Sequence, residues 1–279
     1  MTGHAAKWSV PWRGSLLLGT LVLVCAAISG CAGGPAGAPG AAAPQAEPLT
    51  AFDEPEVRRR ARIRLELASN YFEQGKTTVA LDELKQAIAI DPTLADAYNL
   101  RGLIYMRMNE LALAEDGFRR AVALNPRDAY SQHNYGWLLC QQKRYAESDK
   151  FFEQAEASPT YTNKAKTLMA HGLCQMNAGK MAEAERTLTR SYELDAGNPV
   201  TGYNLAQMLF KRGDLTKAQF YIRRLNNSEY ANAESLWLGI KVERQINDRV
   251  AMAQLGEQLK RRFPASNELT AYEKGAFNE

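Results

Sequence analysis

A period of about 34 residues runs through most of this chain and constrains its fold more than any other feature. Small side chains recur with successive spacings of 34, 34, 36, 34 and 33 residues. These side chains are Ala68, Gly102, Gly136, Gly172, Ala206 and Gly239. A second small-residue series follows twelve residues later, at Ala80, Ala114, Ser148, Ala184, Ala218 and Ala251. A period of this length indicates stacked units that share one continuous core.

The residues between these positions indicate that each unit is a pair of helices, A and B. Ala, Leu, Glu, Lys, Arg and Gln, which favour helices, dominate from residue 56 onward. Pro92 and Pro126 close the first two units at the same phase, because proline cannot continue a helix. Gly75, Gly179 and Gly213 fall in turns inside the units, where positive φ is easily reached. The pattern resembles the tetratricopeptide repeat, in which small residues let helices A and B pack closely.

We therefore predict an all-α fold, a right-handed superhelical solenoid of six tetratricopeptide helix pairs over residues 56–264. Residues 265–279 are predicted to cap the last pair through Tyr272 and Phe277, with simple fraying as the alternative. A two-residue insertion around Ser158-Pro159-Thr160 separates the third and fourth units. The period therefore leaves the local packing at that junction open.

Residues 1–30 have the features of a bacterial lipoprotein signal peptide. Lys7 and Arg13 precede an apolar run of 13 residues, Leu16–Ile28. This run is too short to span a membrane, which takes roughly 20 residues. Ile28-Ser29-Gly30-Cys31 resembles the lipobox, and this resemblance implies that Cys31 carries a diacylglycerol and a further acyl chain. An ordinary signal peptide with an incidental Cys is the alternative. Two or three acyl chains anchor firmly, since each buried CH₂ contributes roughly 0.8 kcal/mol.

The residues after the predicted lipid site suggest where the protein resides and how it is attached. Ala32, rather than Asp, follows the Cys. By resemblance to Gram-negative lipoproteins, this predicts the inner leaflet of the outer membrane, facing the periplasm. Residues 32–52 are mostly Ala, Gly and Pro with almost no charge, a composition that cannot bury enough surface to fold. We expect residues 31–55 to be a lipidated Cys and a flexible tether, with a reach of ~25 Å.

The predicted solenoid offers a groove for a partner protein. In tetratricopeptide proteins the groove is lined by helix A, mainly by its second, fifth, ninth and twelfth places. The candidate partner-binding residues at these places are Phe72, Asn99, Leu103, Met106, Tyr130, His133, Trp137, Met169, Leu173, Met176, Tyr203 and Phe210. The same places in the sixth unit are Ala233, Leu236, Ile240 and Glu243.

The chemistry of these side chains suggests what the groove binds. Met adapts its shape at binding surfaces, and Trp and Tyr are favoured anchors. We predict that the groove takes an apolar strand or an amphipathic helix from a partner. Packing between neighbouring A helices is the alternative role for any one of these residues. The scarcity of Lys and Arg argues against the clamp for acidic C-terminal tails that some chaperone adaptors use.

No catalytic or metal-binding motif is recognisable in the sequence. His133 and His171 have no carboxylate or Cys at metal-ligand spacing, so we interpret them as structural or groove-lining residues. Cys140 and Cys174 could pair in an oxidising compartment, but sequence cannot give the geometry, and we favour two buried thiols. We expect no enzymatic activity, metal or cofactor. Without residues 1–30 the chain has 32 basic and 31 acidic side chains, which gives no case for a nucleic-acid partner.

Three stretches resemble one family more closely than the repeat pattern requires. They are Asn134–Tyr145, Glu234–Ile240 and Leu259–Pro264, and they resemble the type IV pilus biogenesis lipoproteins PilF and PilW, also described as secretin pilotins. The lipobox, the tether and the six units agree with that resemblance. It implies a monomeric outer-membrane pilotin that binds the secretin of the pilus machine and promotes its localisation and multimerisation. The alternatives are a periplasmic adaptor lipoprotein that delivers substrates to a protease or cell-wall enzyme, and an unrecognised hydrolase.

Overall fold

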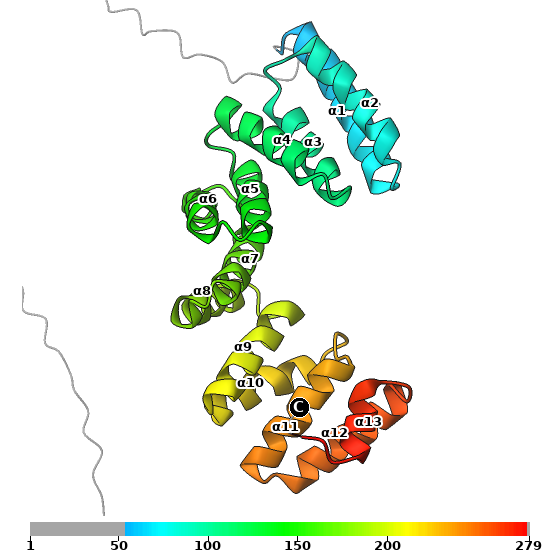
Figure 1. The fold of residues 1–279 in the computed structure, drawn as a ribbon, viewed down its shortest axis with the longest axis vertical. Coiled ribbons are helices and arrows are strands. Elements are labelled where there is room, and N and C mark those ends of the chain that lie inside the picture. Colours follow the sequence, from blue (N-terminus) through cyan, green and yellow to red (C-terminus); the bar gives the residue numbers. More distant parts are fainter. Residues whose placement is uncertain (1–53, 278–279) are drawn as a thin grey trace, which may run out of the picture. The chain divides into compact units, whose positions relative to one another are not determined.

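The computed structural model describes residues 54–277, and these residues form thirteen α-helices (Figure 1). The helices are α1 (Glu56–Glu73), α2 (Thr77–Ile90), α3 (Ala95–Arg107), α4 (Leu111–Leu124), α5 (Ala129–Gln141), α6 (Tyr145–Ala157), α7 (Lys164–Asn177), α8 (Met181–Leu194), α9 (Pro199–Arg212), α10 (Leu215–Asn226), α11 (Ala233–Ile246), α12 (Arg249–Arg262) and α13 (Asn267–Glu273). The predicted signal peptide, the lipid site Cys31 and residues 32–53 of the predicted tether lie outside the described residues.

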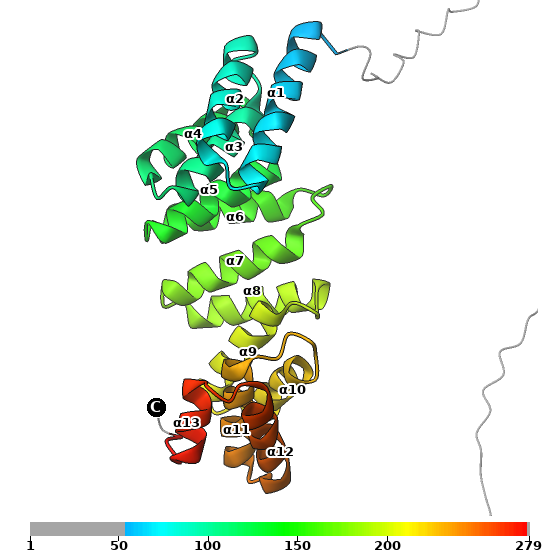
Figure 2. The same cartoon turned by 90° about the vertical axis from the view of Figure 1, so that its right-hand side faces the viewer.

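The first twelve helices pack as six consecutive pairs, from α1 with α2 to α11 with α12 (Figures 1 and 2). Helix B of each pair packs on helix A of the next, and α1, α3, α5 and α7 also contact one another in sequence. The odd-numbered helices from α1 to α11 are therefore the A helices, and they share one side of the stack. The predicted all-helical tetratricopeptide superhelix is confirmed.

The small residues of the period are small because helices A and B approach too closely for larger ones. A Cβ atom added to Gly102 would lie 2.7 Å from the ring of Phe118 in the facing helix. One added to Gly172 would lie 2.6 Å from Leu188. Both large side chains are fully buried. The period thus records a steric requirement, since extra atoms in a filled core force strained rearrangement.

Each turn between helices A and B contains one residue in the left-handed backbone region. Gly75, Gly179 and Gly213 have φ of 77°, 77° and 84°, as predicted from the sequence. The other three turns have Asn109, Lys143 and Asn247 at this place, with φ of 62°, 62° and 66°. Asn tolerates this conformation better than most residues. The turn geometry is therefore preserved in all six units, although glycine is not.

The chain after α12 packs on the last A helix. The ring of Phe277 stacks on Trp237 with 5.3 Å between centroids, and Leu269 of α13 and Tyr272 join the same apolar cluster. Leu236 and Ile240 of α11 are fully buried beneath this segment. The assignment of the fifth and ninth places of the sixth unit to the groove is therefore wrong, because α13 covers α11 there. Glu243, also assigned to the groove, is fully buried as well, against α10.

Candidate partner-binding face

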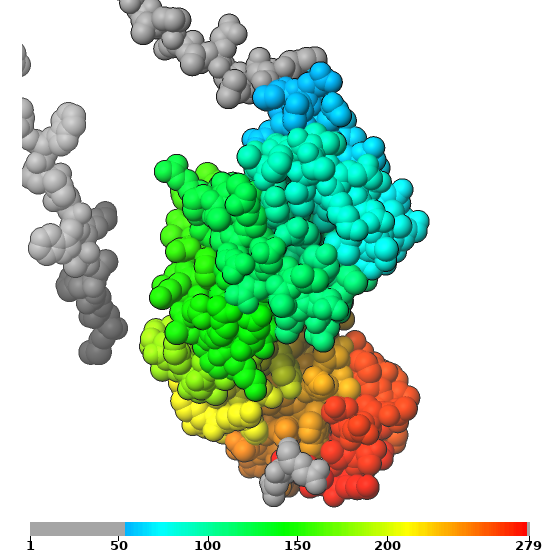
Figure 3. All heavy atoms as spheres, turned by 45° about the horizontal axis from the view of Figure 1, so that its top comes forward, coloured from blue at the N-terminus to red at the C-terminus, as the bar shows by residue number. Residues whose placement is uncertain are grey.

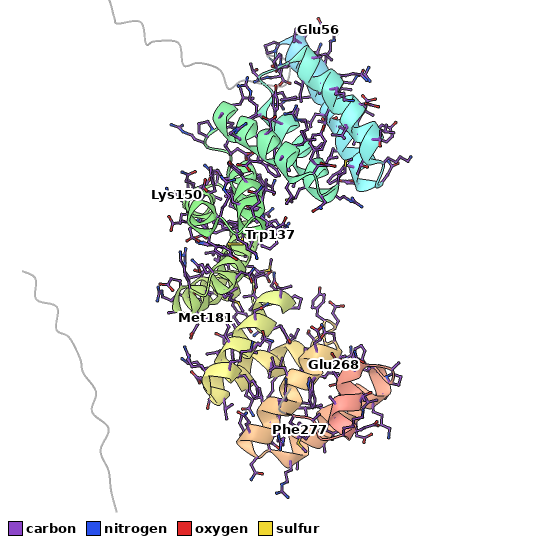
Figure 4. All side chains as sticks on the ribbon, in the orientation of Figure 1. Glu56, Trp137, Lys150, Met181, Glu268 and Phe277 are labelled. Carbon is purple, nitrogen blue, oxygen red and sulfur yellow. A yellow bond between two sulfur atoms is a disulfide. The ribbon has the colours of Figure 1, made fainter. Side chains whose placement is uncertain are left out.

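The twelve candidate residues all lie on A helices, and we call the surface that they share the helix-A face. Phe72 is on α1; Asn99, Leu103 and Met106 are on α3; Tyr130, His133 and Trp137 are on α5; Met169, Leu173 and Met176 are on α7; Tyr203 and Phe210 are on α9. Eleven of them are half-buried, and Tyr130 is 47% exposed. Each side chain therefore packs against a neighbour and also presents some surface. Figure 4 labels Trp137 near the middle of this row.

Hydrogen bonds between neighbouring units fix the orientation of the polar members of this face. Asn134 donates to the side-chain oxygen of Asn99 over 3.0 Å, which joins α5 to α3. Nδ1 of His133 lies 2.9 Å from the hydroxyl of Thr167 on α7. These bonds link residues about one period apart. The stacking of the units thus holds these polar side chains in place.

A disulfide joins Cys140 of α5 to Cys174 of α7, with 5.8 Å between their Cα atoms. The interpretation of these residues as two buried thiols is wrong. The bridge connects helix A of the third unit to helix A of the fourth, across the junction that contains the insertion. Both cysteines belong to a buried cluster with Phe152, and Trp137 packs against that cluster. The disulfide-containing cluster therefore supports Trp137, an aromatic side chain of the helix-A face.

His171 is not part of the helix-A face. Its ring is 4% exposed and lies between two carboxylates of α6, with Nδ1 2.7 Å from Glu156 and Nε2 3.2 Å from Asp149. The ring also stacks on Phe152 at 5.2 Å. This environment gives His171 a structural role in joining α6 and α7. Among residues 54–277 no group of three His, Cys, Asp or Glu side chains is placed to hold a metal ion.

An open pocket of about 580 Å³ lies between α9, α11 and the C-terminal segment, and the sequence mapping found only part of it. Tyr203 and Phe210 were candidates, and both line it. Trp237, Lys211 and Lys241 line it too, although none of them occupies a place used for the mapping. Their contribution depends on α13 and Phe277, which have no counterpart in the repeat period. The surface view in Figure 3 shows the units following one another in chain order down to this last segment.

Comparison with known proteins places the chain in a family. A family model described as "TPR repeat" matches residues 68–109, and one described as "Tetratricopeptide repeat" matches residues 95–128. The type IV pilus assembly protein PilF of Pseudomonas aeruginosa is 30% identical over 209 residues, which cover 75% of this chain and 83% of PilF. The chain belongs to the PilF/PilW family of tetratricopeptide proteins.

Two solved structures of this family agree with the fold. The structure of Pseudomonas aeruginosa PilF matches with a TM-score of 0.70 at 30% identity, covering 78% of this chain and 99% of that one. The structure of PilW, described as a widely conserved type IV pilus biogenesis factor, matches with a TM-score of 0.68 at 29% identity. It covers 77% of this chain and 98% of PilW. As a PilF/PilW relative, the chain is a tetratricopeptide scaffold and not an enzyme. Within residues 54–277 no helix is both long and apolar enough to cross a bilayer.

His133 should make this PilF/PilW-type scaffold less stable in mild acid. Burial, and then the positive charge of Lys166, lower the pKa of His133 from 6.5 to about 4. As pH falls below 6.5, the unfolded chain binds a proton that the native chain does not, so stability is lost. For these two pKa values the loss is about 2 kcal/mol at pH 5.

Urea unfolding at pH 7 and pH 5 measures this loss. The variant His133→Gln keeps a polar side chain but does not titrate, so between the two pH values it should lose about 2 kcal/mol less than the wild type. All carboxylates are common to both proteins and cancel in the comparison. Equal losses in the two proteins would contradict the lowered pKa of His133.

Proposed function

We propose that this chain is an outer-membrane lipoprotein of the type IV pilus machine, anchored by a lipid on Cys31 and facing the periplasm. It binds the secretin as a monomer through the helix-A face and promotes localisation and multimerisation of the secretin in the outer membrane. The row of half-buried apolar and aromatic side chains on five successive A helices is the observation that carries the proposal. The names of its relatives, a pilus assembly protein and a pilus biogenesis factor, support the assignment to that machine.

A secretin subunit is prone to aggregate before it assembles. A β-rich subunit that must assemble into a ring exposes apolar segments and strand edges before it assembles, and such edges aggregate. A scaffold that covers an apolar segment with Trp137, Tyr203 and their neighbours suppresses this aggregation. The lipid holds the covered subunit at the membrane in which it assembles, and such tethering raises its local concentration there.

Deletion of the gene tests the proposal. Outer-membrane fractions run without boiling keep assembled secretin rings distinct from monomers. We expect rings to be lost on deletion, restored by the wild-type gene, and poorly restored by Cys31→Ala. Normal rings together with lost pili would move the function to pilus stability. Normal rings and normal pili would overturn the proposal and leave the periplasmic adaptor in its place.

A second set of variants tests the helix-A face itself. Trp137→Ala combined with Tyr203→Ala removes two anchors from it, and ring formation should fall to the level of the deletion strain. Phe220→Ala is the matched control, because Phe220 is a 58% exposed aromatic residue on the B helix α10. Rings should form normally with this control. If the double variant also formed rings normally at equal protein levels, the helix-A face would not be the binding surface.

A further inference from the structure

The pocket at the C-terminal end of the helix-A face is lined by four charged side chains. Lys211 of α9, Lys241 and Glu234 of α11, and Glu268 of α13 all line it. Within residues 54–277 none of the four takes part in an ion pair. Figure 4 labels Glu268 on α13, next to α11. Charges in a cleft without a partner in the same chain are available to a ligand.

Two neighbouring charges on the same helices do have ion-pair partners within the chain. Arg212, the residue after Lys211, binds Glu185 of the preceding unit. Glu243, two residues after Lys241, is bound by Arg223 at 2.7 Å. These two side chains are therefore held between helices of the chain, whereas the four pocket charges have no ion-pair partner among residues 54–277.

The four charges separate into two ends of the pocket. Lys211 is close enough to Lys241 to lower the pKa of Lys241, after burial, by repulsion. Glu234 and Glu268 both lie near Tyr203, since their charges, after burial, raise the pKa of its hydroxyl. Seven residues separate Glu234 from Lys241, so the two lie on one stripe of α11 about 10 Å apart along the helix axis. The pocket therefore has a positive end and a negative end.

An aromatic surface lies between these two ends. Trp237 stands on the same stripe of α11, three residues after Glu234 and four before Lys241. Its side chain is only 9% exposed, because its ring stacks on Phe277 and the ammonium of Lys241 lies 5.4 Å from its centroid. Tyr203 and Phe210 of α9 also line the pocket, and because they are half-buried they provide most of its open aromatic surface. An apolar side chain placed here is flanked by both charged ends.

We propose that this pocket binds a short extended segment of the partner protein that carries an acidic residue, an apolar residue and a basic residue in close succession. The carboxylate lies between Lys211 and Lys241, the apolar side chain rests on Tyr203 and Phe210, and the basic group meets Glu234 and Glu268. An extended chain rises about 3.3 Å per residue, so charges two or three residues apart span the distance between the two ends. The assignment rests on the proposed function and specifies where, and by what chemistry, the partner is recognised.

The carboxylate end supplies the larger part of the recognition. Two lysines held near each other repel, and an anion placed between them removes that repulsion while forming charge-assisted hydrogen bonds. The two glutamates are on different helices and give the segment its direction, because a reversed segment would bring like charges together. Apolar contact alone gives neither the direction nor a dependence on salt.

Binding of the purified, lipidated full-length protein to solubilised secretin tests this inference. Lys211→Gln with Lys241→Gln should weaken binding at least tenfold in 50 mM salt. At 500 mM salt the difference should shrink to less than threefold, because screening already weakens the wild-type contact. Lys150→Gln with Lys260→Gln is the matched control, because both lysines are exposed residues on B helices and the net charge changes equally. This control should bind within twofold of the wild type.

Two further measurements separate the outcomes. Lys211 and Lys241 should react more slowly with an amine-acetylating reagent when secretin is bound, whereas Lys150 should not. Glu234→Gln with Glu268→Gln should weaken binding about threefold to tenfold. If the wild type binds and the lysine variant binds equally well, the pocket is not the recognition site, although the proposed function stands. If the wild type does not bind secretin, both the proposed function and the secretin as the partner at this pocket are contradicted.

Discussion

Replacing Cys140 and Cys174 together by Ser is expected to lower the free energy of unfolding by about 3–4 kcal/mol. The disulfide closes a loop of 34 residues, and the chain-entropy model gives a stabilisation of this size for such a loop. Cys174 is fully buried and Cys140 is 4% exposed, so the two Ser hydroxyls also enter an apolar cluster. For a helical unit of this length the melting temperature should fall by about 10 °C.

Thermal unfolding followed by circular dichroism, with and without a thiol reductant, measures this effect. Reduced wild type should melt close to the double Ser variant, and the variant itself should not respond to reductant. A melting temperature of the variant within about 2 °C of oxidised wild type would contradict the assigned role of the bridge. The single variants are poor controls, because each leaves a free thiol that can pair between molecules.

The same substitution should weaken partner binding through Trp137, which packs on the disulfide-containing cluster. Deleting the bridge removes a constraint between α5 and α7, the two A helices that carry six of the twelve candidate residues. If α5 and α7 were held less rigidly, binding of a partner would also have to order the helix-A face. This loss of conformational entropy would lower the affinity. We therefore expect oxidation of the two cysteines to favour the helix-A face in its binding conformation.

The six helix pairs are readable from the sequence because their spacing has a steric cause. Gly102 and Gly172 face Phe118 and Leu188 at distances that no larger residue tolerates, so the period is visible in the residue types themselves. Only half of the left-handed turns can be predicted from the sequence. Glycine marks three of them, whereas Lys143 adopts the same conformation without any compositional signal.

The disulfide was missed because its spacing does not match the local repeat. The insertion makes the step between the third and fourth units 36 residues, so a separation of 34 residues places Cys140 and Cys174 at different phases of their A helices. The period could not show that the two side chains point toward each other. That orientation follows from how α5 and α7 pack across the insertion, which depends on tertiary contacts.

The C-terminal pocket was missed for a related reason. The mapping assumed that the sixth A helix is as open as the others, but α13 buries Leu236 and Ile240. The part of α11 that lines the pocket is the neighbouring stripe, with half-buried Lys241 and largely buried Trp237. A repeat period describes the repeated units, and it contains nothing about the segment that ends them.

Arg223→Ala is expected to destabilise the protein by about 3 kcal/mol at neutral pH. The carboxylate of Glu243 is 1% exposed and accepts hydrogen bonds from Nε and Nη2 of Arg223 at 2.7 and 2.9 Å. Gln219 donates a third, at 2.8 Å. Truncating the arginine leaves a buried negative charge without its counter-ion, which costs far more than a surface pair is worth. Urea unfolding of wild type and variant measures the loss.

Two comparison variants make the result specific. Arg186→Ala removes an exposed arginine that lies 3.8 Å from Glu183 on the B helix α8, and it should cost less than about 0.5 kcal/mol. Adding Glu243→Gln to Arg223→Ala should recover part of the loss, because the buried charge is then gone. Equal losses of stability in Arg223→Ala and Arg186→Ala would show that the buried carboxylate of Glu243 does not need Arg223 as its counter-ion. Because Arg223 holds α11 against α10, its loss should also displace Trp237 and Lys241 and weaken binding at the C-terminal pocket.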